Sequence, residues 1–361
     1  MQSILKKILQ IAIVVKDLKK ALKIYTEGYG WGPWSIFYFN PKKVKDMIRN
    51  DKKVDHEFVV AVTFLRDIEI ELIEPLDDKC IYTEFIEEHD EGIHHIAYAV
   101  DNYNEAMKFF RGKGLIVSQE CDMSCTGDLI VTYISTEKDL KHSAEIYKTV
   151  PNYFKYIVDK NGNKRTIYPI PDEVYPPKGS EDKRMESIFK GVLQVGIAVK
   201  NLKKALKIYN DGYGIGPWNI YYFNPKKIKN MIRNNKRVDH EFVVATTTLG
   251  NIEMELMQPL DDKSIYAEFI KKQGEGIHHI AYDVGDYDKA MKFFISKGLI
   301  VTQQGDIGGH IYTYLSTEKD LKQSIKIYKT LPNYFKYDVN KNGNRRSTSF
   351  PIPDEVYPIE R

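Results

Sequence analysis

The chain has 361 residues, of which 42% are hydrophobic and 12% aromatic, so it can form two domains with buried cores. Its 53 Lys and Arg and 50 Asp and Glu residues leave a net charge of +3 with interspersed signs, which disfavours a nucleic-acid partner. The longest early apolar run, Ile11 to Val15, is too short to span a bilayer and is not followed by a signal cleavage site. We therefore expect a cytoplasmic protein without a membrane partner. Its three cysteines, Cys80, Cys121 and Cys125, cannot all pair and are expected to be reduced.

The sequence is an internal duplication. LQIAIVVKDLKKALKIYTEGYGWGPW at 9–34 returns as LQVGIAVKNLKKALKIYNDGYGIGPW at 193–218, an offset of 184 (193 minus 9). EGIHHIAY occurs at 91–98 and again at 275–282. The segment PPKGSEDKR is rich in charge, Pro and Gly, which is typical of a linker. The predicted organisation is a first domain over 1–175, a linker over 176–186 and a second domain over 187–361.

Each half is itself double, at an offset of 85. A short apolar strand is followed by the helical pattern VKDLKKALKIY (15–25), and the same pattern returns as VDNYNEAMKFF (100–110). Asp17 and Asn201 are predicted N-caps. Runs with strand character follow each helix in chain order: Phe58 to Phe64, Ile68 to Ile73, Ile130 to Ile134, and Ala144 to Tyr147. The unit is a strand, a helix and then several strands, and it is present four times.

The inner offset aligns Gln10 with His95, the second histidine of its pair. Alternate residues of a strand share a face, so Gln10, Ala12 and Val14 are predicted to lie on the concave face, where small side chains leave room for a ligand. His95 is expected on that face and His94 on the side of the helix. A strand histidine is more often structural than functional when nothing else accompanies it.

Acidic residues lie on the last strand of each module, called here its closing strand, in IEIELI at 68–73 and SAEIY at 143–147. If the two modules of a half stand side by side, Gln10 and Glu71 face His95 and Glu145 across a cleft. One nitrogen and three oxygens suit one divalent ion of Zn, Co, Ni, Mn or Fe(II). Such an ion eases proton removal next to a bound carbonyl, with a carboxylate as base. Glu69 shares a face with Glu71 and replaces it if the register shifts by two residues, and a hydrogen-bonding role explains Gln10 equally well.

These stretches resemble the vicinal oxygen chelate (VOC) superfamily, and within it glyoxalase I and methylmalonyl-CoA epimerase. The resemblance covers essentially the whole chain and implies an α+β fold of four βαβββ modules, forming two domains whose curved mixed sheets surround clefts. It implies the metal ligands Gln10, Glu71, His95 and Glu145, with Glu145 serving also as the catalytic base. The ligand mix is more similar to glyoxalase I, and the sequence around GIHHIAY to the epimerase.

The second half departs from this pattern at one position, since SIKIY places Lys326 where the first half has Glu145. An ammonium repels a divalent ion and can neutralise Glu255 directly. Gln194, Glu255 and His279 are therefore expected to form, with Lys326, a degenerate site without a metal. The modules can pair within a half or exchange between halves, and both arrangements yield one complete and one degenerate set.

Other candidates have simple structural explanations. Glu57, next to His56, is a second candidate base if its strand faces the cleft. The aromatic residues near GPW are more often core, but Trp31, Trp34, Tyr38 and Trp218 are candidates for a substrate pocket wall. The basic run at 41–45 and its copy at 225–229 are expected on a solvated helix face rather than against a phosphate.

Three functions follow from these patterns. The first is a metal-dependent lyase or isomerase acting on a small molecule or thioester, in a monomer or homodimer. The second is an Fe(II)-dependent extradiol-type dioxygenase, in which two histidines and a glutamate are the typical ligands. The third is a ligand-sequestering protein of the bleomycin-resistance kind, which the full ligand set of the first half disfavours.

Overall fold

The computed structural model describes residues 2–124, 126–127, 129–148, 155–158, 164–168, 170–177, 185–250, 252–329, 337–339, 345–347 and 352–358. Most of the predicted linker over 176–186 and Cys125 lie outside these residues. Cys80 and Cys121 are buried and unpaired. No helix of the described residues is both long enough and apolar enough to cross a membrane.

The first half contains thirteen strands and four α-helices among the described residues. Its strands are β1 Lys7–Val14, β2 Trp34–Phe39, β3 Lys45–Arg49, β4 Lys52–Lys53, β5 Phe58–Leu65, β6 Ile68–Pro75, β7 Gly92–Ala99, β8 Val117–Asp122, β9 Ile130–Ile134, β10 Ser143–Lys148, β11 Lys155–Val158, β12 Lys164–Tyr168 and β13 Glu173–Tyr175. Its helices are α1 Leu18–Lys23, continued by a π-helical turn Ile24–Gly28, α2 Ile81–His89, α3 Tyr103–Gly112 and α4 Glu137–Leu140.

The second half repeats this series. Its strands are β14 Gly191–Ala198, β15 Trp218–Phe223, β16 Lys229–Arg233, β17 Lys236–Arg237, β18 Phe242–Leu249, β19 Ile252–Pro259, β20 Gly276–Asp283, β21 Val301–Ile307, β22 His310–Leu315, β23 Ser324–Lys329, β24 Tyr337–Val339, β25 Arg345–Ser347 and β26 Glu355–Tyr357. Its helices are α5 Leu202–Lys207, with a π-helical turn Ile208–Gly212, α6 Ile265–Gln273, α7 Tyr287–Ser296 and α8 Glu318–Leu321. Both predicted N-caps are confirmed, because Asp17 accepts from the Lys20 backbone N–H and Asn201 from that of Lys204.

Each half is built on one open, mixed sheet, in which the four-module prediction is confirmed. In the first half the order is β13-β2-β5-β6-β1-β7-β10-β9-β8-β3-β4. The two modules meet where β1 pairs antiparallel with β7, and each closing strand runs parallel to the first strand of its own module, β6 to β1 and β10 to β7. The modules therefore pair within a half, which settles the arrangement that the sequence left open.

The two faces of the sheet have separate cores, as the strand alternation predicts. Ile11 and Ile13 belong to the core on the side of α1 and α3, whereas Ala12 and Val14 belong to the core on the concave side, to which α2 also contributes. The basic run at 41–45 forms an exposed turn and the start of β3 rather than a helix. The helix prediction was wrong there because the run lacks an apolar face, burying only Val44.

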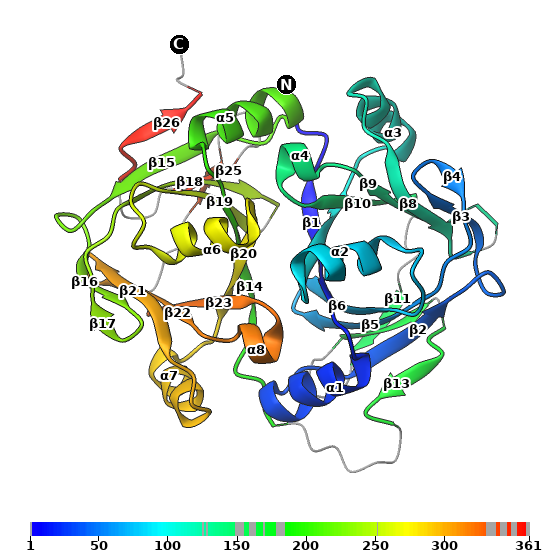
Figure 1. The fold of residues 1–361 in the computed structure, drawn as a ribbon, viewed down its shortest axis with the longest axis horizontal. Coiled ribbons are helices and arrows are strands. Elements are labelled where there is room, and N and C mark those ends of the chain that lie inside the picture. Colours follow the sequence, from blue (N-terminus) through cyan, green and yellow to red (C-terminus); the bar gives the residue numbers. More distant parts are fainter. Residues whose placement is uncertain are drawn as a thin grey trace.

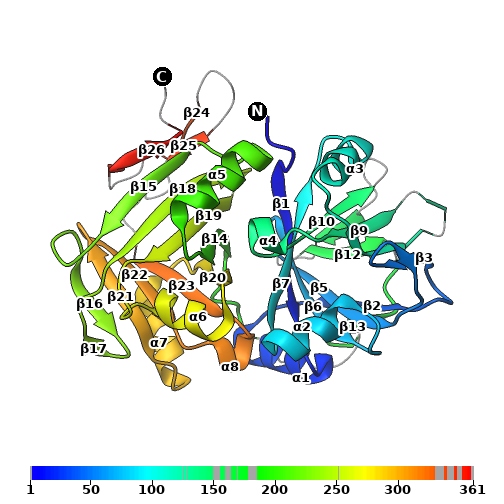
Figure 2. The same ribbon diagram turned by 45° about the horizontal axis from the view of Figure 1, so that its top comes forward.

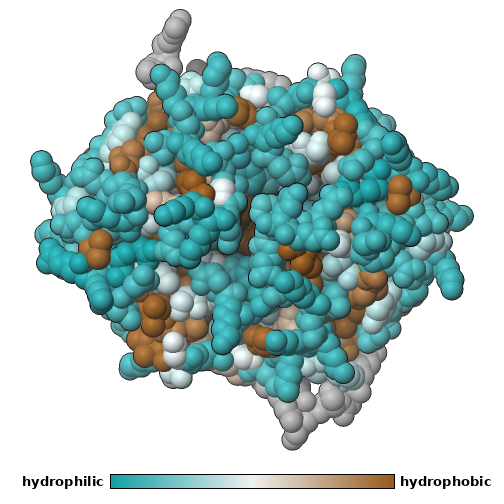
Figure 3. Space-filling model, viewed as in Figure 1, coloured by the Kyte–Doolittle hydropathy of each residue, from teal (hydrophilic) through white to brown (hydrophobic). Residues whose placement is uncertain are grey.

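The halves lie side by side, with β1 and β14 toward the middle of the molecule (Figures 1 and 2). A single hydrophobic core continues from one half into the other. Paired contacts repeat across the boundary: the Tyr25 hydroxyl donates to the Leu321 carbonyl oxygen, and the Tyr209 hydroxyl donates to that of Leu140. The outer surface is mostly hydrophilic in the view of Figure 3, with hydrophobic residues in small separate groups. This continuous core fixes the two sheets relative to each other.

Candidate functional site

The four predicted ligands of the first half come together at the centre of its sheet. The strand pairing places Glu71 of β6 and His95 of β7 on either side of Ala12, and Glu145 of β10 beside β7. All are buried: Gln10 is 3%, Glu71 7%, His95 0% and Glu145 2% exposed. His95 Nε2 lies 3.1 Å from Glu145 Oε2 and 3.5 Å from Glu71 Oε2. The predicted convergence is therefore present in the fold.

Three buried atoms at this point lack a hydrogen-bond partner within the described part of the chain: Glu71 Oε2, His95 Nε2 and Glu145 Oε2. Buried polar atoms are otherwise nearly always paired. Two ligands at about 2.1 Å from one ion lie about 3.0–3.5 Å apart, so the two separations suit a shared ion. No group of three or more His, Cys, Asp or Glu side chains, among the residues placed here, already has the arrangement of an assembled metal centre.

The charges of these groups depend on one another. Burial lowers the pKa of His95, but the neighbouring Glu145 and Glu71 together outweigh burial and raise this pKa to about 9. Burial raises the pKa of Glu71 to about 7, although the neighbouring charge of His95 opposes this shift. Two buried carboxyl groups thus lie next to a single imidazole, which can compensate the negative charge of only one of them.

Gln10 connects this set to two residues that the ligand prediction left out. Its Nε2 donates to Glu69 Oε1 at 2.6 Å, and its Oε1 accepts from the Tyr147 hydroxyl at 2.9 Å. Burial, and then the charge of Glu71, raises the pKa of Glu69 to about 8. Glu69 was weighed only as a replacement for Glu71, whereas the fold holds both. Tyr147 is two residues beyond Glu145 and on its face of the strand, and this spacing was the signal for including it.

The second half has the same geometry around a lysine. Lys326 Nζ donates to Gln194 Oε1 at 3.0 Å and to Glu255 Oε1 and Oε2 at 3.1 and 3.0 Å. His279 Nε2 lies 3.4 Å from Glu255 Oε2 and 3.2 Å from Gln194 Oε1. Burial alone raises the pKa of Glu255, but Lys326 and His279 together outweigh burial and lower this pKa to about 2. The ammonium occupies the space between the donor oxygens, as the lysine substitution predicted.

Comparisons with known proteins agree with this architecture. A family model described as the Glyoxalase/Bleomycin resistance protein/Dioxygenase superfamily matches residues 9–133 and 193–314, more than half of the chain. The chain belongs to this superfamily. Its two matched segments coincide with the two sheets, so the resemblance to VOC proteins is confirmed for both halves.

Within the superfamily, the chain is similar to epimerases in sequence. It is 28% identical over 118 residues to the mitochondrial methylmalonyl-CoA epimerase of Dictyostelium discoideum, a match over 32% of this chain and 63% of the relative. It is 39% identical over 75 residues to the ethylmalonyl-CoA/methylmalonyl-CoA epimerase of Cereibacter sphaeroides, over 20% of this chain and 56% of the relative. The matches thus span less than two thirds of either relative's length.

A solved structure shares the two-half arrangement. It is a mutant 4-hydroxymandelate synthase from Streptomyces coelicolor, with a TM-score of 0.52 and 11% sequence identity, over 90% of this chain and 92% of that one. At this identity the similarity concerns the fold alone.

The residues considered for a substrate pocket wall lie elsewhere. Trp31, Trp34 and Trp218 are buried in the core on the helix side, where Trp31 packs against Phe189 and Tyr282 of the other half. Tyr38 is exposed, and its hydroxyl donates to Glu173. These positions follow from strand alternation, which turns Trp34 and Ile36 toward the helices and Phe37 and Phe39 toward the concave face.

A small cavity of about 40 Å³ lies beside the first site. Its polar lining is Gln10, Glu69, Glu71, Tyr133, Glu145 and Tyr147, and its apolar lining is Phe37, Phe39, Phe58, Val60, Val62, Cys121, Met123 and Val131. This volume holds an ion with a few water-sized ligands but no large ligand. The prediction of Trp31, Trp34, Tyr38 and Trp218 as a pocket wall is therefore wrong for this cavity, which phenylalanines of β2 and β5 line instead.

Glu57, the second candidate base, is not part of this cavity lining. Its side chain is exposed just before β5, and its backbone N–H donates to Asp77. The neighbouring His56 is buried, with its Nδ1 hydrogen-bonded to the Val54 carbonyl oxygen at 2.9 Å. The structure therefore brings Glu145, and not Glu57, to the predicted ligands.

Proposed function

We propose that the first half is a metal-dependent lyase or isomerase, of the epimerase or glyoxalase I type, that moves a proton next to a carbonyl group. The observation that carries this proposal is the ammonium of Lys326 in the second half. Its contacts with Gln194 and Glu255 support the view that this scaffold accommodates a positive charge at the centre of the cluster. In the first half the same three positions surround Glu145 instead, which adds a negative donor and leaves the cation to come from solution.

The donor set of the first half fits a divalent ion. Glu71, His95 and Glu145 supply three buried atoms without hydrogen-bond partners in the described chain, and Gln10 adds an amide oxygen beside them. An imidazole with carboxylate and amide oxygens suits Zn, Co, Ni, Mn or Fe. When bound, the ion supplies Lewis-acid stabilisation for the negative charge that develops on a carbonyl oxygen.

The chain itself supplies the base and the walls. Glu145 is the proposed base, because its carboxylate lies at the cavity and needs only a small movement to reach a proton next to the carbonyl. The stacked rings of Phe39 and Phe58, with centroids 4.6 Å apart, keep water from one side of the reacting group. The cavity accommodates only the reacting end of a substrate, so the remainder of a thioester lies outside it. Small carbonyl compounds and acyl thioesters are the substrate classes that fit.

Metal analysis of the protein purified without chelators tests this proposal. We expect about one divalent ion per chain, and a loss of this ion in Glu145→Gln. Glu120→Gln is the matched control, because Glu120 lies on β8 outside the cavity lining and the second half has Gln304 there. With methylmalonyl-CoA in D2O, the loaded wild type and the control should exchange the proton next to the carbonyl, and Glu145→Gln should not.

The same analysis separates the other functions. Absence of any bound ion in wild type after incubation with Zn, Co, Ni, Mn or Fe contradicts the proposal and favours a sequestering protein. Iron accompanied by oxygen consumption favours a dioxygenase. The donor set disfavours a dioxygenase, since it contains one histidine where non-haem Fe(II) oxygenases typically have two.

A further inference from the structure

The histidine pair of β7 lies at a β-bulge. The register with β1 shifts from Ala12 opposite His95 to Ile13 opposite Ile93, so His94 is the extra residue and the alternation of faces is interrupted there. The Nδ1 atoms of His94 and His95 consequently meet at 2.9 Å. His95 faces Glu71 and Glu145, whereas His94 lines a second cavity of about 450 Å³ between the halves. His94 and His95 also share contacts with the Tyr82 ring, so a substitution of His94 that keeps this ring packing tests the Nδ1 contact itself.

A hydrogen bond between two Nδ1 atoms requires that one ring donates and the other accepts. If His95 binds an ion through Nε2, its remaining proton is on Nδ1, because the neutral ring carries only one. His95 Nδ1–H is then the donor and His94 Nδ1 the acceptor. The opposite assignment puts the proton of neutral His95 on Nε2, where it blocks the metal.

We propose that His94 is a positioning residue that fixes the tautomer and ring orientation of His95 for metal binding, an inference that rests on the proposed function. Metal-bound histidines usually donate their second ring nitrogen to a carboxylate, a carbonyl or water. Here an imidazole takes this role. Its ring is held edge-to-face by Tyr82 and Phe85, with centroids 5.3 and 5.1 Å away. The acceptor is therefore oriented before any ion arrives.

The second half provides an internal comparison. His278 and His279 have Nδ1 atoms 3.2 Å apart, and Tyr266 and Phe269 hold the His278 ring at 5.3 and 5.1 Å. His279, however, lies 3.2 Å from the Gln194 oxygen and next to the Lys326 ammonium site. The same pair is thus present where no ion is expected, which makes His278 the matched control for His94.

The test compares zinc and cobalt affinities, measured by competition with a chromogenic chelator. His94→Phe keeps the ring packing and removes the acceptor, and we expect it to weaken affinity by about 10–100-fold, the range for such supporting contacts. His94→Asn returns an acceptor oxygen near the Nδ1 position and should recover most of the affinity. His278→Phe should leave affinity unchanged.

A tautomer measurement keeps the test independent of folding in the variants. Nitrogen-15 NMR of the zinc-loaded wild type should show His95 protonated at Nδ1 and His94 at Nε2. A zinc-loaded His95 without a proton on Nδ1 overturns the inference, as does a His94→Phe affinity equal to that of wild type. Both results leave the metal-binding proposal intact, whereas a wild type that binds no ion contradicts the proposed function itself.

Discussion

The two halves of this chain have nearly the same scaffold but differ in what lies next to a buried glutamate. Gln10, Glu71 and His95 recur as Gln194, Glu255 and His279, each set at the junction of the central strands. Only the fourth position differs in kind, Glu145 against Lys326. In the first half the proposed cation comes from outside, and in the second the ammonium of Lys326 is part of the chain. One side chain therefore decides whether this cluster is a candidate binding site or a closed ion pair.

The pKa values express the same contrast. The pKa of Glu71 is raised to about 7 by burial, while that of Glu255 is lowered to about 2 because Lys326 and His279 together outweigh burial. The pKa of His95 is raised to about 9 because Glu145 and Glu71 together outweigh burial. Burial instead lowers the pKa of His279 to about 4, and Lys326 adds to this effect. The pKa values of equivalent residues thus shift in opposite directions in the two halves, where Glu145 and Lys326 carry opposite charges.

Exchanging the fourth residues should have the largest effect. Glu145→Lys should weaken metal binding by more than about 100-fold, beyond the loss typical of a supporting contact, because an ammonium repels the ion and pairs with Glu71. Lys326→Glu should create a second Gln-Glu-His-Glu set and raise the content from one to two ions per chain. Metal content and calorimetric titration measure both effects.

The double variant is the control for this exchange. Glu145→Lys with Lys326→Glu should bind one ion, now in the second half. If Lys326→Glu folds but stays at one ion per chain, the fourth residue does not distinguish the halves. The explanation must then lie elsewhere, such as in Gly196 against Ala12 beside the histidine.

Removing only the charge of Lys326 should have the next largest effect. Lys326→Met keeps the length of the side chain but leaves Glu255 buried without its cation. Removing one partner of a buried pair typically costs about 3–5 kcal/mol. Urea unfolding at pH 7 measures this cost. Glu145→Gln is the comparison, and it should cost less because Glu145 has no built-in cation other than His95.

The pH dependence of this cost identifies its origin. The folded-state pKa of Glu255 is about 2, below its ordinary 4.5, so the pair stabilises the fold fully above pH 4.5 and loses this effect as the pH falls toward 2. In Lys326→Met, burial should raise the pKa of Glu255, so the buried carboxyl protonates and the penalty declines as the pH falls from 7 to 4.5. A penalty constant over this range would indicate lost packing rather than an uncompensated charge.

The sequence predicted the modules and the central cluster because both depend on short-range periodicity. Strand alternation placed Gln10, Glu71, His95 and Glu145 on one face, and the repeat showed which positions of the modules correspond. Pairing within a half could not be predicted, because it depends on the β1 to β7 contact and on the core shared between the halves. The tryptophans were considered for the pocket because size and aromaticity do not indicate a face. Only their positions along β2 place Trp34 in the core on one face of the sheet and Phe37 in the core on the other.

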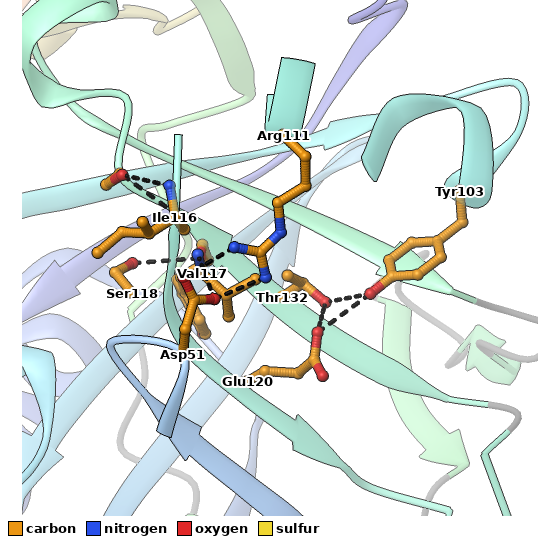
Figure 4. A network of polar contacts seen from close by, with 10 residues as sticks. Asp51, Tyr103, Arg111, Ile116, Val117, Ser118, Glu120 and Thr132 are labelled. Atoms are coloured by element: carbon orange, nitrogen blue, oxygen red, sulfur yellow. Dashed lines mark hydrogen bonds and ion pairs between the residues drawn. The ribbon is translucent and has the colours of Figure 1, made fainter. Parts of the chain in front are cut away.

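The smallest expected effect concerns a pair that only the first half has. Arg111 of α3 binds Asp51 through two contacts of 2.8 and 2.6 Å, beside the contacts of Tyr103 and Thr132 with Glu120 (Figure 4). The second half has Ile295 and Asn235 at the equivalent positions. The Arg111 and Asp51 side chains are 47% and 33% exposed, so solvent screens the pair.

Arg111→Ile should therefore cost at most about 1 kcal/mol of stability, and less at high salt. Arg111→Lys should keep part of this contribution, because it retains the charge but not the two-point contact. Urea unfolding at low and high ionic strength measures both. A cost well above 1 kcal/mol that persists at high salt would mean that the pair anchors α3 to the sheet. The second half must then hold α7 by other contacts, such as the ion pair of Asp288 with Lys329 of β23.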